Sequence, residues 1–89
     1  MTDQVTAQVT VEELAALMRR TAGVTVDPRE LAERAESGFD AFGLDSLGLL
    51  GIVGELEKSH GLDLPDHAER CRTPREFLRC VNGALTTEV

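Results

Sequence analysis

The dipeptide Asp45-Ser46 is the place in this chain where residue type and spacing suggest chemistry. An aspartate can cap a helix by accepting hydrogen bonds from backbone N–H groups, which would place Ser46 in the first turn. Those N–H groups and the positive end of the helix dipole favour an anion at that position. The sequence therefore predicts that a phosphoryl group on the Ser46 hydroxyl would be stabilised. Taken alone, an Asp-Ser pair is more often only a helix start.

A catalytic serine is the main alternative reading of Ser46. Such a serine needs a base within hydrogen-bond reach, held in turn by a third group. The context Leu-Asp-Ser-Leu-Gly is not the Gly-x-Ser-x-Gly elbow of serine hydrolases. His60 lies 14 residues further along the same predicted helix, about 21 Å away at 1.5 Å per residue. His67 lies beyond the next loop, so this distance does not exclude it as the base. A hydrolase therefore stays open as a disfavoured alternative.

The two cysteines, Cys71 and Cys80, complete the set of reactive side chains. Two cysteines are too few for a disulfide scaffold, and no CxxC or paired Cys/His spacing indicates zinc. We predict structural thiols and no metal site.

Two helical segments are predicted before Ser46. The first begins after Thr10, which forms a capping box with Glu13, and ends at Gly23. A short helix is expected over residues 28–35, because Asp-Pro precedes Arg-Glu at its start. Residues 37–44 are expected to be a loop that anchors in the core. The anchors are Phe39 and Phe42.

The central helix is predicted from Asp45 to about His60, with Gly61 as its stop. At 100° per residue, one broad arc is apolar and should face the core. The members of this arc are Leu49, Leu50, Ile52, Val53, Leu56 and His60. The opposite face is expected to be exposed and contains Gly48, Gly51, Gly54, Glu55 and Lys58.

The remaining chain supplies the last helix. Residues 62–65 should form a connecting loop and residues 66–71 one further helical turn. A third capping box at Thr73 begins the last helix, whose apolar stripe consists of Phe77, Leu78, Val81 and Leu85. No segment alternates with the period of a strand. We predict an all-α fold, a small antiparallel bundle of three main helices plus one or two short helices.

Composition limits the function further. The chain has 89 residues, a net charge of −7 and 42% hydrophobic residues, with three phenylalanines as its aromatics. A domain of this size buries a limited share of its surface, so we do not expect a large enclosed active site. The acidic net charge argues against binding to nucleic acid or to anionic membranes, because such binding requires clustered basic residues on the protein. Six acidic residues against Lys58 give a net charge of −5 over residues 40–66, so partners with basic patches are expected.

No apolar run reaches the roughly 18–20 residues of a membrane span, and the first ten residues lack the pattern of a secretory signal. We therefore expect a cytoplasmic protein. Its organisation is predicted as a flexible tail over residues 1–9, one domain over 10–85 and a short tail over 86–89.

A resemblance emerges from the whole pattern. Residues 42–47 read Phe-Gly-Leu-Asp-Ser-Leu, which resembles the Gly-x-Asp-Ser-Leu motif of acyl carrier proteins. Residues 60–65, His-Gly-Leu-Asp-Leu-Pro, and residues 73–78, Thr-Pro-Arg-Glu-Phe-Leu, continue it in one register over about residues 10–85. The chain looks most like the discrete carrier proteins of bacterial type II (aromatic) polyketide synthases.

The resemblance implies a carrier and not an enzyme, with the helical bundle of that family. It implies that a phosphopantetheinyl transferase moves 4′-phosphopantetheine from coenzyme A to Ser46. The thiol of this arm would then carry acyl groups as thioesters to the ketosynthase, acyltransferase and tailoring enzymes of a polyketide synthase. A monomer is expected, and the aliphatic core could open to shelter a cargo. The alternatives are a fatty-acid carrier, a peptidyl carrier and a non-carrier helical interaction domain.

The sequence departs from the family on the partner-facing side of the central helix. Relatives usually have acidic or larger residues where this chain has glycine at positions 48, 51 and 54. Each glycine costs a helix about 1 kcal/mol relative to alanine. Either this is drift on an exposed face, or the bare strip lets a partner approach the backbone closely. The candidate recognition residues are Asp45, Leu47, Gly48, Gly51, Gly54, Glu55 and Glu57.

Overall fold

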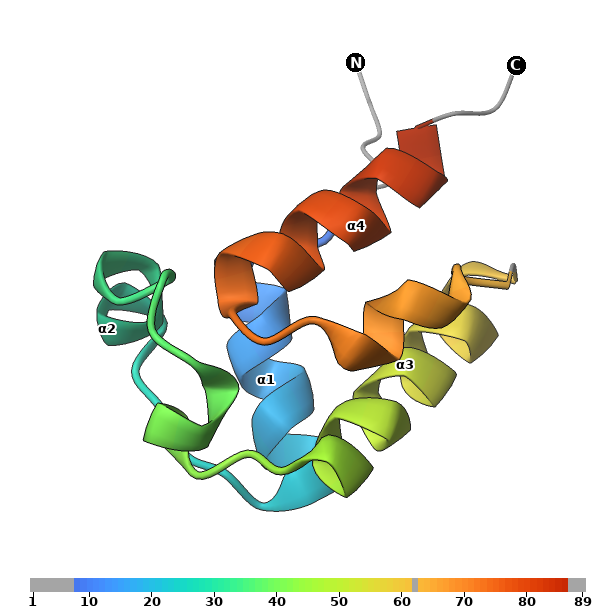
Figure 1. The fold of residues 1–89 in the computed structure, drawn as a ribbon. Coiled ribbons are helices and arrows are strands. Elements are labelled where there is room, and N and C mark those ends of the chain that lie inside the picture. The colour runs from blue at the N-terminus through green and yellow to red at the C-terminus, as the bar shows by residue number, and fades with distance from the viewer. Residues whose placement is uncertain (1–7, 62, 87–89) are drawn as a thin grey trace, which may run out of the picture.

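The computed structural model describes residues 8–61 and 63–86, and within these ranges the chain is helical with no strand. The predicted all-α class is therefore confirmed. Three longer helices alternate with shorter segments along the chain (Figure 1). In order, they are α1 (Val11–Ala22), α2 (Pro28–Glu33), the 3₁₀ turn η1 (Phe39–Phe42), α3 (Ser46–His60), the 3₁₀ turn η2 (Asp66–Arg70) and α4 (Pro74–Thr86).

The helix boundaries follow the predicted capping residues. Thr10 accepts a hydrogen bond from the Glu13 N–H at 3.1 Å, and Thr73 accepts one from the Glu76 N–H at 3.1 Å. Gly23 closes α1 with a φ of 72°, a left-handed conformation that L side chains rarely adopt. The residues that cap these helices act on neighbouring backbone groups, which explains why the helix ends can be predicted from the sequence.

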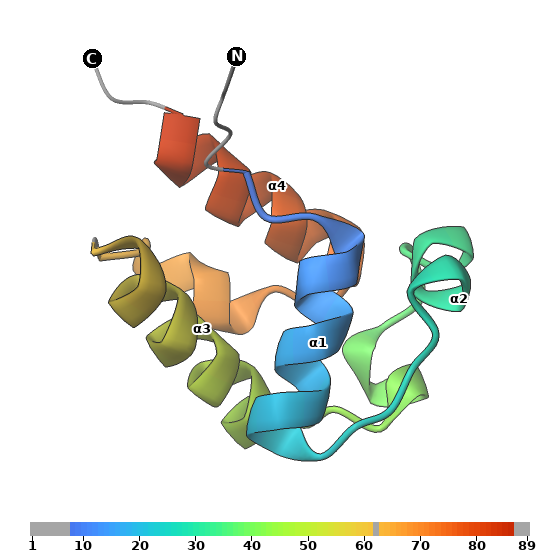
Figure 2. The ribbon, with the colours of Figure 1, turned by 180° about the vertical axis from the view of Figure 1, so that it is seen from behind.

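The helices enclose one aliphatic core. α1 packs along α3, α2 packs on α1, and η2 lies against both α3 and α4. Figure 2, seen from behind, places α1 in front, with α3 and α2 on its two sides. Phe77 of α4 is fully buried and meets Phe39 of η1 edge to face, with ring centroids 5.9 Å apart. The core is therefore mainly aliphatic, as the composition predicts, and contains one aromatic pair.

The segment predicted as a loop over residues 37–44 contains a helical turn, η1, so this part of the prediction is wrong. The Gly43 N–H donates to the Asp40 carbonyl at 3.0 Å, and Gly43 ends the turn with a φ of 87°. Phe39 is buried as expected, whereas Phe42 is only half-buried and lies under the Arg34 guanidinium. A single 3₁₀ turn is too short to create a periodic pattern in the sequence.

The packed domain extends one residue further towards the N-terminus than predicted. Val9, which the sequence placed in a tail, is only 3% exposed. Its N–H donates to Asn82 Oδ1 at 2.6 Å, and its carbonyl accepts from Asn82 Nδ2 at 3.1 Å. This pair joins residues 73 positions apart, a contact that no local pattern reveals. The predicted tail residues 1–7 and 87–89 lie outside the described residues, as does Leu62 of the predicted connecting loop.

Candidate functional site

Ser46 is the first residue of α3, and its side chain is exposed. Asp45 caps the helix as predicted, since its carboxylate accepts a hydrogen bond from the Gly48 N–H at 2.8 Å. The Asp45 carbonyl accepts the Leu49 N–H at 3.0 Å and so begins the helical pattern. Among the described residues, the Ser46 hydroxyl takes part in no hydrogen bond, so its oxygen is available for substitution.

A series of backbone hydrogen bonds fixes the approach to Ser46. The Arg72 carbonyl accepts the Phe39 N–H at 2.7 Å, and the Phe39 carbonyl accepts the Leu44 N–H at 3.1 Å. Leu44 is 3% exposed and lies two residues before Ser46. The start of α3 is therefore connected through η1 to the segment between η2 and α4. Sequence reasoning missed this connection because its partners are distant in the chain.

A cavity of about 650 Å³ opens beside Ser46. It lies between η1 and the start of α3 on one side and the end of η2 on the other. Besides Ser46, its lining includes two arginines and three carboxylates that the sequence did not bring together. The charged lining residues are Asp40, Asp45, Glu69, Arg70 and Arg72. An apolar floor is supplied by Phe39, Leu44 and Leu49.

Cys71 also lines this cavity, and together with Cys80 it lines a neighbouring hollow. Burial, followed by the proximity of Cys80 and Glu76, raises the pKa of the Cys71 thiol to about 11. Burial likewise raises the pKa of Cys80. Both groups are therefore protonated thiols at neutral pH and poor nucleophiles, as the prediction of structural cysteines requires.

The histidines lie away from this cavity. His60 is at the opposite end of α3 from Ser46, and its Nε2 is buried without a hydrogen-bond partner among the described residues. His67 is on η2 but does not line the Ser46 cavity. The arrangement thus supplies no imidazole base at the serine, which disfavours the hydrolase alternative. No cluster of three or more metal-ligating side chains occurs in the described part of the chain.

The exposed face of α3 differs from the predicted one. Leu50, which the periodicity assigned to the core, is 47% exposed, and that assignment is wrong. Leu47 beside Ser46 is 74% exposed. The helix has apolar residues on more than one side, and α1 and η2, which pack against it, leave Leu47 and Leu50 uncovered. Leu49, Ile52, Val53 and Leu56 are buried as predicted.

The three glycines of α3 have different surroundings. A Cβ on Gly48 would lie 2.7 Å from Leu44 Cδ1 and 3.1 Å from Ala22 Cβ, so Gly48 faces the end of α1 and not open solvent. A Cβ on Gly51 would be in ordinary contact with Thr21 at 3.8 Å. Gly54 has no neighbouring atom within 4 Å of that position. The predicted bare strip is therefore interrupted at Gly48, because this residue packs against α1.

The two acidic candidates on α3 already have intramolecular partners. Glu55 lies 3.7 Å from the Arg20 guanidinium of α1, and both side chains remain partly exposed. The Glu57 carboxylate accepts the Leu64 N–H at 2.8 Å and so holds the loop after α3. Glu57 thus has a structural role that the sequence did not predict, whereas Glu55 is held in a weak surface ion pair.

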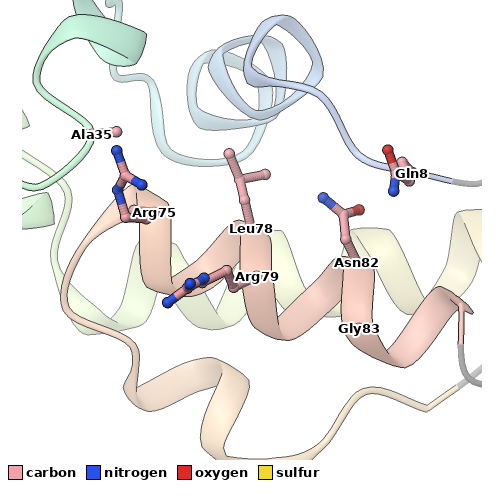
Figure 3. Close-up of a pocket in the computed structure, with 7 residues that line it drawn as sticks. All are labelled: Gln8, Ala35, Arg75, Leu78, Arg79, Asn82 and Gly83. Atoms are coloured by element: carbon pink, nitrogen blue, oxygen red, sulfur yellow. The ribbon is translucent and has the colours of Figure 1, made fainter.

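A third hollow, of about 460 Å³, is lined mainly by residues of α4, together with Gln8 and Ala35. Figure 3 shows Leu78 and Asn82 projecting from α4 towards α1 and the residues that precede it, while Arg75 points to Ala35. Arg75 is already engaged, with its Nε 3.1 Å from Glu36 and its backbone N–H bonded to the Ala35 carbonyl at 2.9 Å. Ser46 does not line this hollow.

The fold and site together define a class of protein: a small helical bundle that presents an unhindered serine at the start of a helix, beside a cavity. Comparison with known proteins specifies the family. Residues 12–81 match the family described as "Phosphopantetheine attachment site". The chain belongs to this family and is an acyl carrier protein.

The relatives of this chain include acyl carrier proteins that are named for polyketide synthases. The chain is 69% identical over 90 residues, covering all of both chains, to a "Probable acyl carrier protein" of Streptomyces coelicolor. It is 62% identical over 87 residues, 98% of each chain, to the "Curamycin polyketide synthase acyl carrier protein" of Streptomyces cyaneus. The fold matches the actinorhodin apo acyl carrier protein of S. coelicolor with a TM-score of 0.74 and 32% identity, over 92% of this chain and 96% of that one. The predicted resemblance and the carrier function in polyketide biosynthesis are confirmed.

Family membership implies a covalently attached 4′-phosphopantetheine. The residues at the start of α3 fit such a group. The Ser46 side chain is exposed and makes no hydrogen bond among the described residues, and the cavity beside it leaves room for a substituent. Two arginines on the cavity wall have the charge that a phosphodiester would attract.

Proposed function

We propose that Ser46 is the attachment site of the 4′-phosphopantetheine arm, and that the chain acts as a carrier without catalysing a reaction itself. When bound, the arm supplies a terminal thiol on which acyl groups are held as thioesters. The protein contributes an accessible hydroxyl, a helix start that stabilises an attached phosphate, and a cavity next to it. The observation that carries this proposal is the exposed Ser46 side chain at the first position of α3.

Intact-protein mass spectrometry tests the attachment site. The apo-protein is incubated with coenzyme A and a promiscuous phosphopantetheinyl transferase. We expect the wild-type chain to gain one phosphopantetheinyl group and the Ser46→Ala variant to gain none, because the acceptor oxygen is removed. Ser59→Ala, on an exposed position near the other end of α3, is the control and should be modified fully. Addition that persists in Ser46→Ala would contradict the proposal.

Specific partners are inferred from the same function. We infer that a phosphopantetheinyl transferase loads the chain, and that ketosynthase, acyltransferase and tailoring enzymes of a polyketide synthase exchange acyl groups with it. We also infer that it acts as a monomer in the cytoplasm. No helix of the described residues has the length and apolar character required to cross a bilayer.

The partner contact is proposed on the exposed face of α3. Leu47 and Leu50 are the large exposed apolar residues of the described chain, and both are close in sequence to Ser46. Gly51 and Gly54 extend this face without bulky side chains. Glu55 and Glu57 have intramolecular partners but keep their negative charge, so acidic attraction to a basic partner adds to this apolar contact. Asp45 and Gly48 contribute through the local structure at the start of α3.

Acyl transfer to a type II polyketide ketosynthase measures this contact. Leu47→Ala and Leu50→Ala are each expected to lower kcat/KM by about tenfold, since each removes one apolar side chain from a buried interface. Both leucines are already exposed, so the fold should tolerate the changes. Glu33→Ala, on an exposed position of α2, serves as the control. Equal transfer rates for all three variants and the wild type would place the contact elsewhere.

A further inference from the structure

Two arginines line the cavity beside Ser46, and the backbone of one of them, Arg72, is held in a defined position relative to the serine. Arg72 has its carbonyl bonded to the Phe39 N–H at 2.7 Å and its own N–H bonded to Glu76 Oε1 at 2.9 Å. Phe39 is in turn bonded to Leu44, two residues before Ser46. The backbone of Arg72 is therefore fixed both to the helix α4 and to the segment that leads into α3.

The side chain of Arg72 is exposed and forms no ion pair with another described residue. Between residues that the structure describes, the ion pairs involve three other arginines, which are Arg20, Arg34 and Arg75. The Arg72 backbone is constrained, but its guanidinium has no partner there. An arginine with five N–H donors, placed at the edge of a cavity, is suited to bind an oxyanion.

The carboxylates on the cavity wall form no ion pair with this guanidinium. Asp40, Asp45 and Glu69 line the cavity, yet none is within ion-pairing distance of Arg70 or Arg72. Asp45 is committed to the Gly48 N–H as the helix cap. Gly38 adds to the close packing of this wall, since a Cβ there would lie 2.5 Å from Asp40 Oδ1 and 3.7 Å from the Arg72 carbonyl oxygen.

We propose that the Arg72 guanidinium binds the phosphodiester of the arm attached to Ser46 and is a positioning residue for that arm. This inference rests on the proposed attachment at Ser46. The phosphodiester carries one negative charge, and its oxygens would lie on the wall of the cavity that both residues line. Arg72 then works with the start of α3, whose dipole attracts the same charge. The arm leaves the protein in a restricted direction, along the side of η2.

The test compares apo- and holo-protein by readouts other than acyl transfer. The Arg72 Nε–H resonance in ¹⁵N NMR should shift when the arm is added to the wild-type chain. Attachment should also raise Tm by about 4 °C at low salt. In Arg72→Gln this rise should disappear, and the ³¹P transverse relaxation of the arm should slow towards that of free coenzyme A. Arg72→Lys retains the charge and should retain part of the rise.

Arg79→Gln is the matched control, because Arg79 is an exposed arginine of α4 that does not line the Ser46 cavity. It should behave as the wild type. An unshifted Arg72 Nε–H resonance in the wild-type holo-protein would overturn the role of Arg72, and so would equal ³¹P relaxation in Arg72→Gln and Arg79→Gln. Neither result would affect the proposed attachment at Ser46. The wild-type resonance decides the question even if Arg72→Gln does not fold. Mass spectrometry of the same samples separates the two claims: absence of the arm from Ser46 would overturn both.

Discussion

Replacing Phe77 by alanine should destabilise the protein by about 3–5 kcal/mol, as for other fully buried aromatic side chains. Phe77 is 0% exposed and its ring meets that of Phe39 at an interplanar angle of 80°. Removal of the ring leaves a cavity in the core and withdraws an edge-to-face contact. A domain of 89 residues has about 4–13 kcal/mol of stability in total, so this one substitution removes a large part of it.

Urea unfolding monitored by circular dichroism measures the loss, and Phe42→Ala is the matched control. Phe42 is half-buried and lies 5.1 Å from the Arg34 guanidinium carbon, so its truncation should cost only about 1–2 kcal/mol. If both variants lost the same free energy of unfolding, the buried pair of Phe39 and Phe77 would not be the anchor of the core.

Two glycines of α3, Gly54 and Gly48, should respond in opposite directions to replacement by alanine. Gly54→Ala is expected to raise the free energy of unfolding by about 1 kcal/mol, because alanine favours the helix and its Cβ meets no atom within 4 Å. Gly48→Ala is expected to lower it by about 1 kcal/mol. There the helix gains the same amount, but overpacking against Leu44 and Ala22 costs more than this gain.

Gly51→Ala should resemble Gly54→Ala, since its Cβ would make only an ordinary contact with Thr21 at 3.8 Å. It should stabilise the helix much as Gly54→Ala does. Urea unfolding of the three variants under identical conditions gives the comparison. A Gly48→Ala variant as stable as Gly54→Ala would mean that α1 does not constrain this position. In sequence the three glycines look alike, so their separation would be a direct consequence of packing.

The helices and their ends were predictable because they depend on neighbouring residues. Thr10, Asp45 and Thr73 each bond a backbone N–H three residues ahead, and Gly23 and Gly61 end helices in the left-handed conformation. The candidate attachment residue was predictable for the same reason. Its position after a capping aspartate follows from the local sequence.

The short turn η1 and the docking of Val9 could not be predicted in this way. η1 has one turn and no periodic pattern, and Val9 is held by Asn82 from the other end of the chain. The exposure of Leu50 was mispredicted because hydrophobic periodicity gives the direction of a side chain around its helix and not the extent of the neighbouring helix.

The sequence by itself determined the all-helical class, the helix starts and stops, and the serine at the start of the central helix. These depend on contacts within a few residues and on a family pattern that runs along the chain. Only the tertiary structure decided that Arg72 lies on the same cavity as Ser46, that Gly48 packs against α1, and that Leu50 is left exposed. Each of these depends on which distant segments come together, and that is set by the packing of the whole core.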